Sequence, residues 1–482
     1  MNFLSVLRGG PGNGKALLKN TSWLFIGEIV GRLIRFWIVV YAARVMGASE
    51  YGVFSYALTI AAFATILADI GISALLTRET SKDPESSGKY FNALFATKLI
   101  LIAIVGVSIY LILPILSGVS GLNPLIPLIL AMFAFDSLRE FGFGVLRGME
   151  KMEKEAVTKI LMNLLITGFG FWALYVEQTA YSLSLGYVLG AGIGCLLTFL
   201  LLKDFFLRIK EGLDISLVWP LIKMAWPIGI LQLLGAIMVN TDMLMLGWWR
   251  SPEELGYYGA AQKIILLLYV APSLVASAAF PLFSRLALQA KEQFREVFEK
   301  TVCASQLLAF PLAVGGIILA KDLMILLFGQ EYASGSVTLA LLLSTLIIVF
   351  PSTLFSNALF AYNKQKLFTK FVLLGVGLNF AFNYLLIPRF GIEGAAAATI
   401  ISQLLANLFI WREMYITNSF MILPKLKRIL VAGVIMGIFC SILTQFDIPV
   451  LLNVAIGIAV YLAALIALKE PIFKEIRKII IR

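Results

Sequence analysis

Residues 90–116 have the sequence YFNALFATKLILIAIVGVSIYLILPIL, a run with one charged side chain, Lys98. A helix of about 20 apolar residues is long enough to cross a bilayer. The rest of the chain has the same character, since 60% of its 482 residues are hydrophobic and 14% are charged. A soluble protein of this length carries far more charge. The sequence therefore predicts an all-α, polytopic membrane protein.

Fourteen apolar runs of this kind follow one another along the chain, separated by short polar connections. None of the connections on the predicted outer side is long enough for a folded domain. The runs lie at about residues 20–44, 51–77, 90–116, 122–147, 157–177, 180–203, 218–248, 254–284, 300–320, 333–361, 367–388, 391–412, 427–446 and 449–468.

The basic residues are sorted between alternate connections. Of 39 Lys and Arg, 30 fall on one side of the predicted membrane, termini included, and four fall on the other side. Basic residues accumulate on the cytoplasmic side of membrane proteins. Both termini are therefore expected in the cytoplasm. The net charge of +11 is explained by topology, so no nucleic-acid partner is expected.

The rarer residue types exclude several kinds of chemistry. There is no histidine, which excludes Ser-His-Asp and Cys-His catalysis and histidine metal sites. The three cysteines, Cys195, Cys303 and Cys440, lie in apolar runs and are expected to be packing residues. We expect no catalytic residue, no metal and no cofactor, and the chain is not predicted to be an enzyme.

The chain also contains an internal repeat. The stretch EYGVFSYA at residues 50–57 is matched by ELGYYGAA at residues 254–261. The offset corresponds to six spans, an even number, so the two halves are parallel repeats, as in many transporters. The predicted domains are a six-helix lobe, an amphipathic cytoplasmic linker, a second six-helix lobe, and two accessory helices with a basic tail, at residues 1–203, 204–217, 218–416 and 417–482.

Three ionisable residues lie on one face of the first span. Glu28, Arg32 and Arg35 are spaced i, i+4 and i+7. A charge at the centre of a bilayer costs about 2.5 to 3.5 kcal/mol, so such residues normally face a partner or a wet cavity. Glu28 and Arg32 could simply neutralise each other, which leaves Arg35 as the least explained of the three. Gly27 and Gly31 beside them would admit a neighbouring backbone or a ligand.

Further charges lie in later spans. Asp136 and Arg139 are close enough to pair within their own helix. Lys263 has no acid within one turn, and Asp242 could cap a helix pair, coordinate a cation or hold Lys263. Cations without acidic neighbours suit a phosphate or pyrophosphate group. The candidate phosphate-binding residues are Arg32, Arg35, Lys263, Lys98 and Arg139, and the candidates for proton or sodium coupling are Glu28, Asp69 and Asp242.

Several stretches resemble a known family. They are ARVMGASEYGVFS at residues 43–55, DIG at 69–71 and NYLLIPRFGIEGAA at 383–396. Over about residues 15–415 the chain is similar to the polysaccharide flippases, which export O-antigens and lipid-linked oligosaccharides. Their superfamily includes the multidrug and toxin extrusion transporters and the peptidoglycan lipid flippase.

The resemblance implies twelve core helices in two lobes, alternating access, and a cationic central cavity for the substrate phosphate. The last two spans resemble the extra pair of the peptidoglycan lipid flippase, which forms a groove for the lipid tail. The predicted function is a prokaryotic, inner-membrane flippase for a polyprenyl- or dolichyl-linked glycan, with membrane lipids and glycan-assembly enzymes as further partners.

Two other functions are compatible with parts of the sequence. A cation-coupled multidrug exporter would share the fold, but it would favour acidic residues in its cavity. A polytopic glycosyltransferase or polymerase would need sizeable outer loops, which the sequence lacks.

Overall fold

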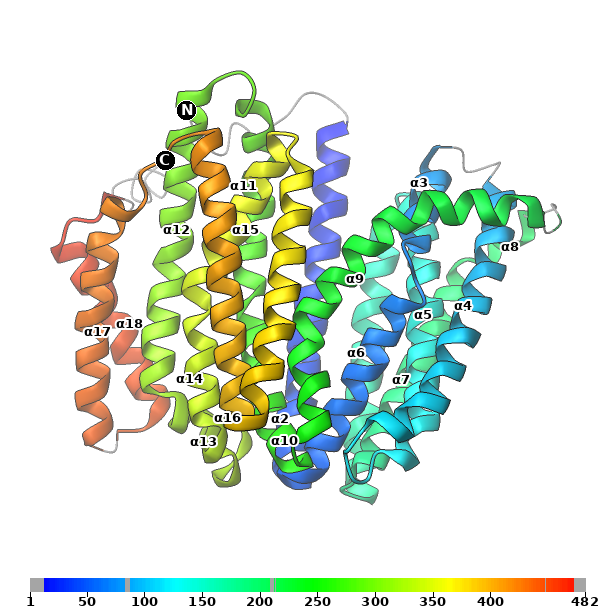
Figure 1. The fold of residues 1–482 in the computed structure, drawn as a ribbon, viewed down its shortest axis with the longest axis horizontal. Helices are drawn as coiled ribbons and strands as arrows, with labels where there is room; N and C mark the ends of the chain where they lie inside the picture. The colour runs from blue at the N-terminus through cyan, green and yellow to red at the C-terminus, as the bar shows by residue number, and fades with distance from the viewer. Residues whose placement is uncertain (1–12, 83–86, 209–211, 213, 447, 472–482) are drawn as a thin grey trace. The chain divides into compact units, whose positions relative to one another are not determined.

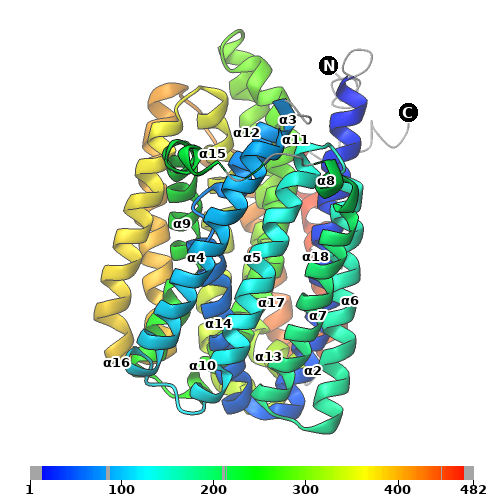
Figure 2. The same ribbon diagram turned by 90° about the vertical axis from the view of Figure 1, so that its right-hand side faces the viewer.

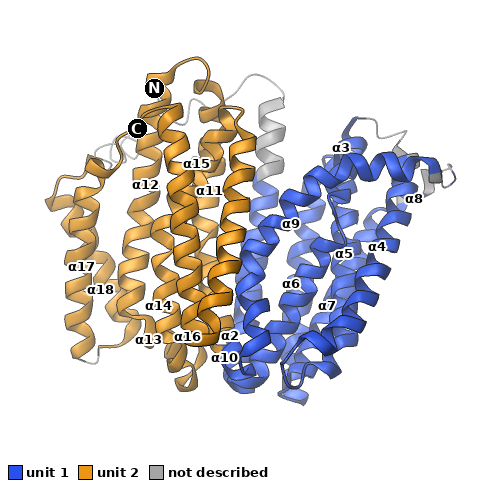
Figure 3. Ribbon diagram, in the orientation of Figure 1, with its two compact units in different colours: residues 1–256 blue, residues 257–482 orange. Residues whose placement is uncertain are grey.

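The computed structural model describes residues 13–471 except 83–86, 209–211, 213 and 447, and all regular secondary structure in these residues is helical (Figure 1). The predicted all-α class is confirmed. The chain divides into two compact units, residues 1–256 and 257–482, and each is described by itself (Figure 3). The predicted lobes at residues 1–203 and 218–416 use different boundaries and stay a prediction.

The first unit is a bundle of long helices. Helices α5, α6 and α7 pack side by side, and α2 packs on α6 (Figure 2). The helices are α2 (Asn13–Leu67), α3 (Ile72–Lys82), α4 (Ser87–Leu116), α5 (Ile126–Gly148), α6 (Met152–Val176), α7 (Ala180–Leu201), α8 (Lys203–Arg208), α9 (Val218–Trp249) and the start of α10 (Pro252–Leu268), with short 3-10 turns η1 (Asn123–Leu125) and η2 (Ile215–Leu217).

In its described residues, the second unit contains the rest of α10 and eight further α-helices. Helices α17 and α18 pack against each other, and α17 packs on α12. The elements are α11 (Val270–Leu286), α12 (Lys291–Ile318), α13 (Ala320–Phe328), η3 (Gln330–Gly335), α14 (Ser336–Ser344), α15 (Leu346–Ala361), α16 (Gln365–Thr417), η4 (Leu423–Leu426), α17 (Lys427–Gln445) and α18 (Val450–Ala467).

Two of the longest helices contain a sharp break at a glycine. Gly47 in α2 has φ 77° and ψ 172°, and Gly391 in α16 has φ 61° and ψ −135°. Residues with a Cβ rarely adopt these conformations, and glycine does so without strain. The Gly47 break lies between the predicted spans at 20–44 and 51–77, and the Gly391 break lies at the first residue of the predicted span at 391–412.

The helices have the length and composition of membrane spans. Among the described residues, ten helices are long and apolar enough to cross a membrane, or eleven if the bent pair of Ser22–Leu67 and Ile72–Lys82 counts as one span. Helix α4 leaves large apolar side chains such as Ile100, Val107 and Leu111 more than half exposed, as expected of a lipid-facing helix. The protein is a multi-pass membrane protein, and the count of fourteen spans stays a prediction.

Aromatic side chains of the first unit pack against one another next to α8. Phe205 and Phe206 lie in the predicted amphipathic linker, and the ring centroid of each lies 5.3 Å from that of Phe91. Phe205 is buried and Phe206 is half-buried against the core of the first unit, and the amphipathic linker at residues 204–217 stays a prediction. The three cysteines are buried and unpaired, as predicted.

Candidate functional site

The charged face of the first span meets α6. Arg32 donates to Glu28 at 2.7 Å, which is the neutralising pair expected from their spacing. Lys159 of α6 lies 3.6 Å from Glu28 and 3.1 Å from Glu155. Gly27 and Gly31 allow this approach, since an added Cβ at Gly27 would lie 2.8 Å from the Cα of Ala156. Gly27 therefore admits the backbone of α6, and Gly31 admits the Asn163 side chain, whose Nδ2 would lie 2.6 Å from an added Cβ.

The network continues into α5. Arg147 donates to the fully buried Glu155 at 2.6 Å and to Glu140 at 3.4 Å. Arg139 lies 3.8 Å from Glu140 and forms an ion pair with Asp136, as predicted. Arg32, Lys159, Arg147 and Arg139 therefore each have at least one carboxylate partner, and the charge of Arg139 is balanced within the protein.

Arg35 has different surroundings. Its Nε donates to Oδ1 of Asn163 at 2.8 Å, and the centre of its guanidinium lies 5.9 Å from the ring centroid of Tyr187. Asn163 is held in turn because its side-chain amide donates to the carbonyl of Lys159 at 2.7 Å. In the part of the chain that the structure describes, Arg35 forms no ion pair within 4.0 Å. A half-buried cation is thus positioned by neutral groups.

Lys98 and Asp69 contact each other. The Lys98 ammonium is fully buried and lies 2.8 Å from Asp69 Oδ1, which also accepts from the Ser73 hydroxyl. Asp69 stands at the break between α2 and α3, where Ile70 and Gly71 have φ of 43° and 80°. Lys98, the predicted phosphate-binding residue, and Asp69, the predicted ion-coupling residue, therefore form one ion pair. Both roles stay predictions.

Removing one partner of this pair should destabilise the protein. Lys98→Met leaves the Asp69 carboxylate buried and uncompensated, which typically costs about 3 to 5 kcal/mol. The double variant Lys98→Met with Asp69→Asn removes both charges and should recover much of the loss. Folded protein is measured by fluorescence-detected gel filtration of a tagged chain in detergent. Equal yields of the single variant and the unmodified protein would contradict the expectation.

The remaining candidates lie further along the chain. Asp242 is buried in α9 of the first unit, and Lys263 is half-buried in the part of α10 that belongs to the second unit. Each takes part in polar or electrostatic interactions. The structure brings Arg32 and Arg35 onto the same helix face, and a common site with Lys263 stays a prediction.

Sequence reasoning missed the residues of α6 and α7 that organise the site. Glu155, Lys159 and Asn163 are spaced four residues apart, so they share one face of α6. Their spacing is visible in the sequence, but Lys159 lies near the start of the predicted span at 157–177, among the 30 basic residues on the cytoplasmic side, and Asn163 is uncharged. Tyr187 lies in an apolar helix and gives no signal in the sequence.

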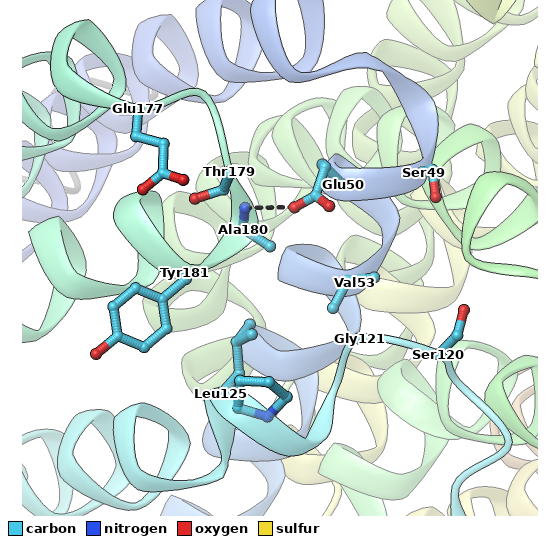
Figure 4. Close-up of a pocket in the computed structure, with 11 residues that line it drawn as sticks. Ser49, Glu50, Val53, Ser120, Gly121, Leu125, Glu177, Thr179, Ala180 and Tyr181 are labelled. Atoms are coloured by element: carbon cyan, nitrogen blue, oxygen red, sulfur yellow. Dashed lines mark hydrogen bonds between the residues drawn. The ribbon is translucent and has the colours of Figure 1, made fainter.

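A separate pocket of about 420 Å³ lies elsewhere in the first unit. Figure 4 shows Glu50, Glu177, Thr179 and Tyr181 around it, from the segment after the Gly47 break and the start of α7. Glu50 accepts a hydrogen bond from the backbone N–H of Ala180 at 2.7 Å. This contact caps the N-terminus of α7, so the carboxylate has a structural role.

Comparison with known proteins identifies the family. The model described as polysaccharide biosynthesis protein matches residues 17–287, more than half of the chain. The chain belongs to the polysaccharide biosynthesis protein family. The resemblance found in the sequence is confirmed. A second model, MatE, matches residues 227–385 of this family member.

Curated relatives of this polysaccharide biosynthesis protein extend over most of its length. It is 24% identical to the probable low-salt glycan biosynthesis flippase Agl15 of Haloferax volcanii, over 97% of this chain and 99% of the relative. It is 22% identical to a putative O-antigen transporter of Shigella flexneri, over 82% of this chain and 97% of the relative. Capsular polysaccharide biosynthesis protein CapF of Staphylococcus aureus is 19% identical, over 81% and 97%.

Solved structures share the fold. The lipid II flippase MurJ in an inward closed conformation superimposes with a TM-score of 0.79 at 17% identity, covering 93% of this chain and 99% of MurJ. A MATE transporter in complex with MaL6 gives a TM-score of 0.56 at 18% identity, covering 86% of this chain and 99% of that structure. The fold of this polysaccharide biosynthesis protein is thus the one shared by MurJ and the MATE transporters.

Proposed function

We propose that this protein is a flippase that moves a lipid-linked oligosaccharide from the cytoplasmic to the outer leaflet by alternating access. The glycan would be carried on a polyprenyl or dolichyl phosphate or pyrophosphate and would serve cell-surface polysaccharide or glycoprotein synthesis. Family membership and relatives named as glycan flippases and an O-antigen transporter support the substrate class. The observation that carries the proposal is the environment of Arg35.

Arg35 is suited to an anionic ligand. Its Nε is occupied by Asn163, so the two terminal nitrogens remain to meet a pair of phosphate oxygens in the bidentate geometry that guanidinium favours. Arg32, one turn earlier, has a side chain that is 46% exposed beside Glu28. Lys263 completes the proposed site, and Lys98 and Arg139 would contribute as entry-side cations only when their ion pairs open.

The proposed membrane arrangement has fourteen spans with both termini in the cytoplasm of a prokaryote, in the inner (cytoplasmic) membrane. The breaks at Gly47 and Gly391 would divide α2 and α16 into two spans each. The sorting of 30 basic residues to one side supports the orientation. An inside-negative potential then favours outward movement of an anion by about 2.3 kcal/mol per charge per 100 mV. Glu28, Asp69 and Asp242 are the proposed residues for proton or sodium coupling.

A cation-coupled multidrug exporter is the second candidate, because the MatE model matches residues 227–385. A cationic drug would need an acidic partner in the cavity. Arg35, in the first unit, has a hydrogen bond to Asn163 and no ion pair to a described residue, and this cation supports an anionic substrate over a cationic drug.

The test is the distribution of lipid-linked glycan between leaflets in cells that lack this protein. An impermeant sugar-binding probe is applied to intact cells and to opened cells. We expect the glycan to accumulate where the probe reaches it only after opening, because translocation is the missing step. Glycan missing from both leaflets would indicate a role in synthesis, and a normal distribution would favour the drug exporter.

A further inference from the structure

The two copies of the internal repeat touch each other within the first unit. Gly52 belongs to the first copy, in α2, and Gly256 to the second, at the start of α10. A Cβ added to Gly52 would lie 1.7 Å from the carbonyl oxygen of Pro252, and one added to Gly256 would lie 2.0 Å from that of Ala48. Ala48 and Pro252 each precede their glycine by four residues. The contact is therefore reciprocal, with each glycine on the backbone of the other copy.

Only glycine fits at these two positions. A Cβ at such distances overlaps a backbone oxygen, which cannot turn aside as a flexible side chain can. Both glycines lie within helices, where alanine would otherwise be favoured by about 1 kcal/mol. Neither has a positive φ. The need for glycine here comes from the close approach of the two helices, as in small-residue contacts between membrane helices.

Neighbouring residues extend the contact. A Cβ on Gly247, near the end of α9, would lie 2.3 Å from the ring of Tyr56 in α2. The N–H of Gly118, in the connection after α4, donates to the carbonyl oxygen of Gly247 at 3.2 Å. The segment that joins α9 to α10 thus packs closely on α2 and on the connection that follows α4. The connections in this contact are ones that the basic residues assign to the outer side of the membrane.

We propose that this reciprocal glycine contact is the outer gate of the transport pathway. It is closed in this structure by direct backbone packing, and it parts when the pathway opens to the outside. In parallel repeats the matching segments lie on the same side of the membrane, so they can meet there and separate as the halves move. The identity of the cargo rests on the proposed function, whereas the gate can be tested without it.

The test uses a cysteine reporter in whole cells. Alanine replaces the three native cysteines, Cys195, Cys303 and Cys440. Leu255→Cys, at the fully buried position next to Gly256, then provides one reactive thiol. With both glycines present, the thiol should react slowly with an impermeant maleimide added outside. Gly52→Ala or Gly256→Ala should speed labelling at least about tenfold, because the added methyl holds the helices apart.

Gly168→Ala in α6 is the matched control, since no described heavy atom outside its own helix lies within 4 Å of a Cβ there, and it should label slowly. Labelling that is as slow in both gate variants as in this control would overturn the gate. Faster labelling of the gate variants would support the gate. A normal glycan distribution in cells lacking the protein would, separately, contradict the proposed glycan cargo. The two proposals therefore fail separately.

A second variant tests the gate without altering the repeat glycines. A Cβ at Gly118 would lie 3.5 Å from the carbonyl oxygen of Trp248, so Gly118→Cys with Trp248→Cys places two thiols across the contact. Oxidation should stop glycan export, and a reductant should restore it. Full export by the oxidised, cross-linked protein would show that the contact stays closed throughout the cycle, and the gate would be overturned even if the glycine variants failed to fold.

Discussion

Arg35→Ala is expected to abolish glycan export while the protein still inserts and accumulates. Each hydrogen bond to a charged group contributes about 1.5 to 3 kcal/mol, so the loss of the proposed phosphate contacts should lower transport by tenfold or more. Folding should be affected little, because Arg35 has one hydrogen bond, to Asn163, and no ion pair to a described residue. Export is measured with the leaflet probe, and accumulation by immunoblot of the membrane fraction.

The controls separate charge from geometry. Arg35→Lys keeps the charge but loses the planar fork, so it should retain part of the activity. Arg412→Ala removes a cation whose side chain is 72% exposed and paired with Glu413, and it should export normally. Lys263→Ala is expected to behave like Arg35→Ala. Normal export by both Arg35→Ala and Lys263→Ala would remove the proposed site.

Glu155→Gln should cause a large loss of stability. The Glu155 carboxylate is fully buried and accepts from Arg147 at 2.6 Å and from Lys159 at 3.1 Å. The amide is almost the same size but leaves two partly buried cations without their shared anion, which typically costs about 3 to 5 kcal/mol.

Thermal unfolding of the purified protein in detergent measures this effect. Glu153→Gln, an exposed position two residues earlier on the same helix, is the control and should unfold close to the temperature of the unmodified protein. The same melting temperature for Glu155→Gln and the control would show that the buried network contributes little to stability.

The fold was largely predictable because its signals are local. Apolar runs near 20 residues and alternating charge predicted a multi-pass helical protein. The break at Gly47 falls between two predicted spans, and the break at Gly391 falls at the start of one. Pairs within one helix were also predictable, since Glu28 with Arg32 and Asp136 with Arg139 follow from helical spacing.

Contacts between helices were not predictable in this way. Lys98 lies in α4 and Asp69 lies 29 residues earlier, at the break between α2 and α3, and nothing in their spacing indicates that they meet. Asn163 is 128 residues from Arg35, and its amide carries no charge that would mark it as a partner. Packing decides such contacts, and a single sequence does not reveal which helix faces align.

The reciprocal contact of Gly52 and Gly256 has the form of an isologous interface, in which the same patch is used on both sides. In a dimer of identical half-length chains, one codon would change both sides of such an interface at once. In this fused chain the two glycines are encoded separately, so each side of the contact can be altered while the other is kept. A single substitution therefore makes this contact asymmetric, and it leaves the glycine of the other copy in place.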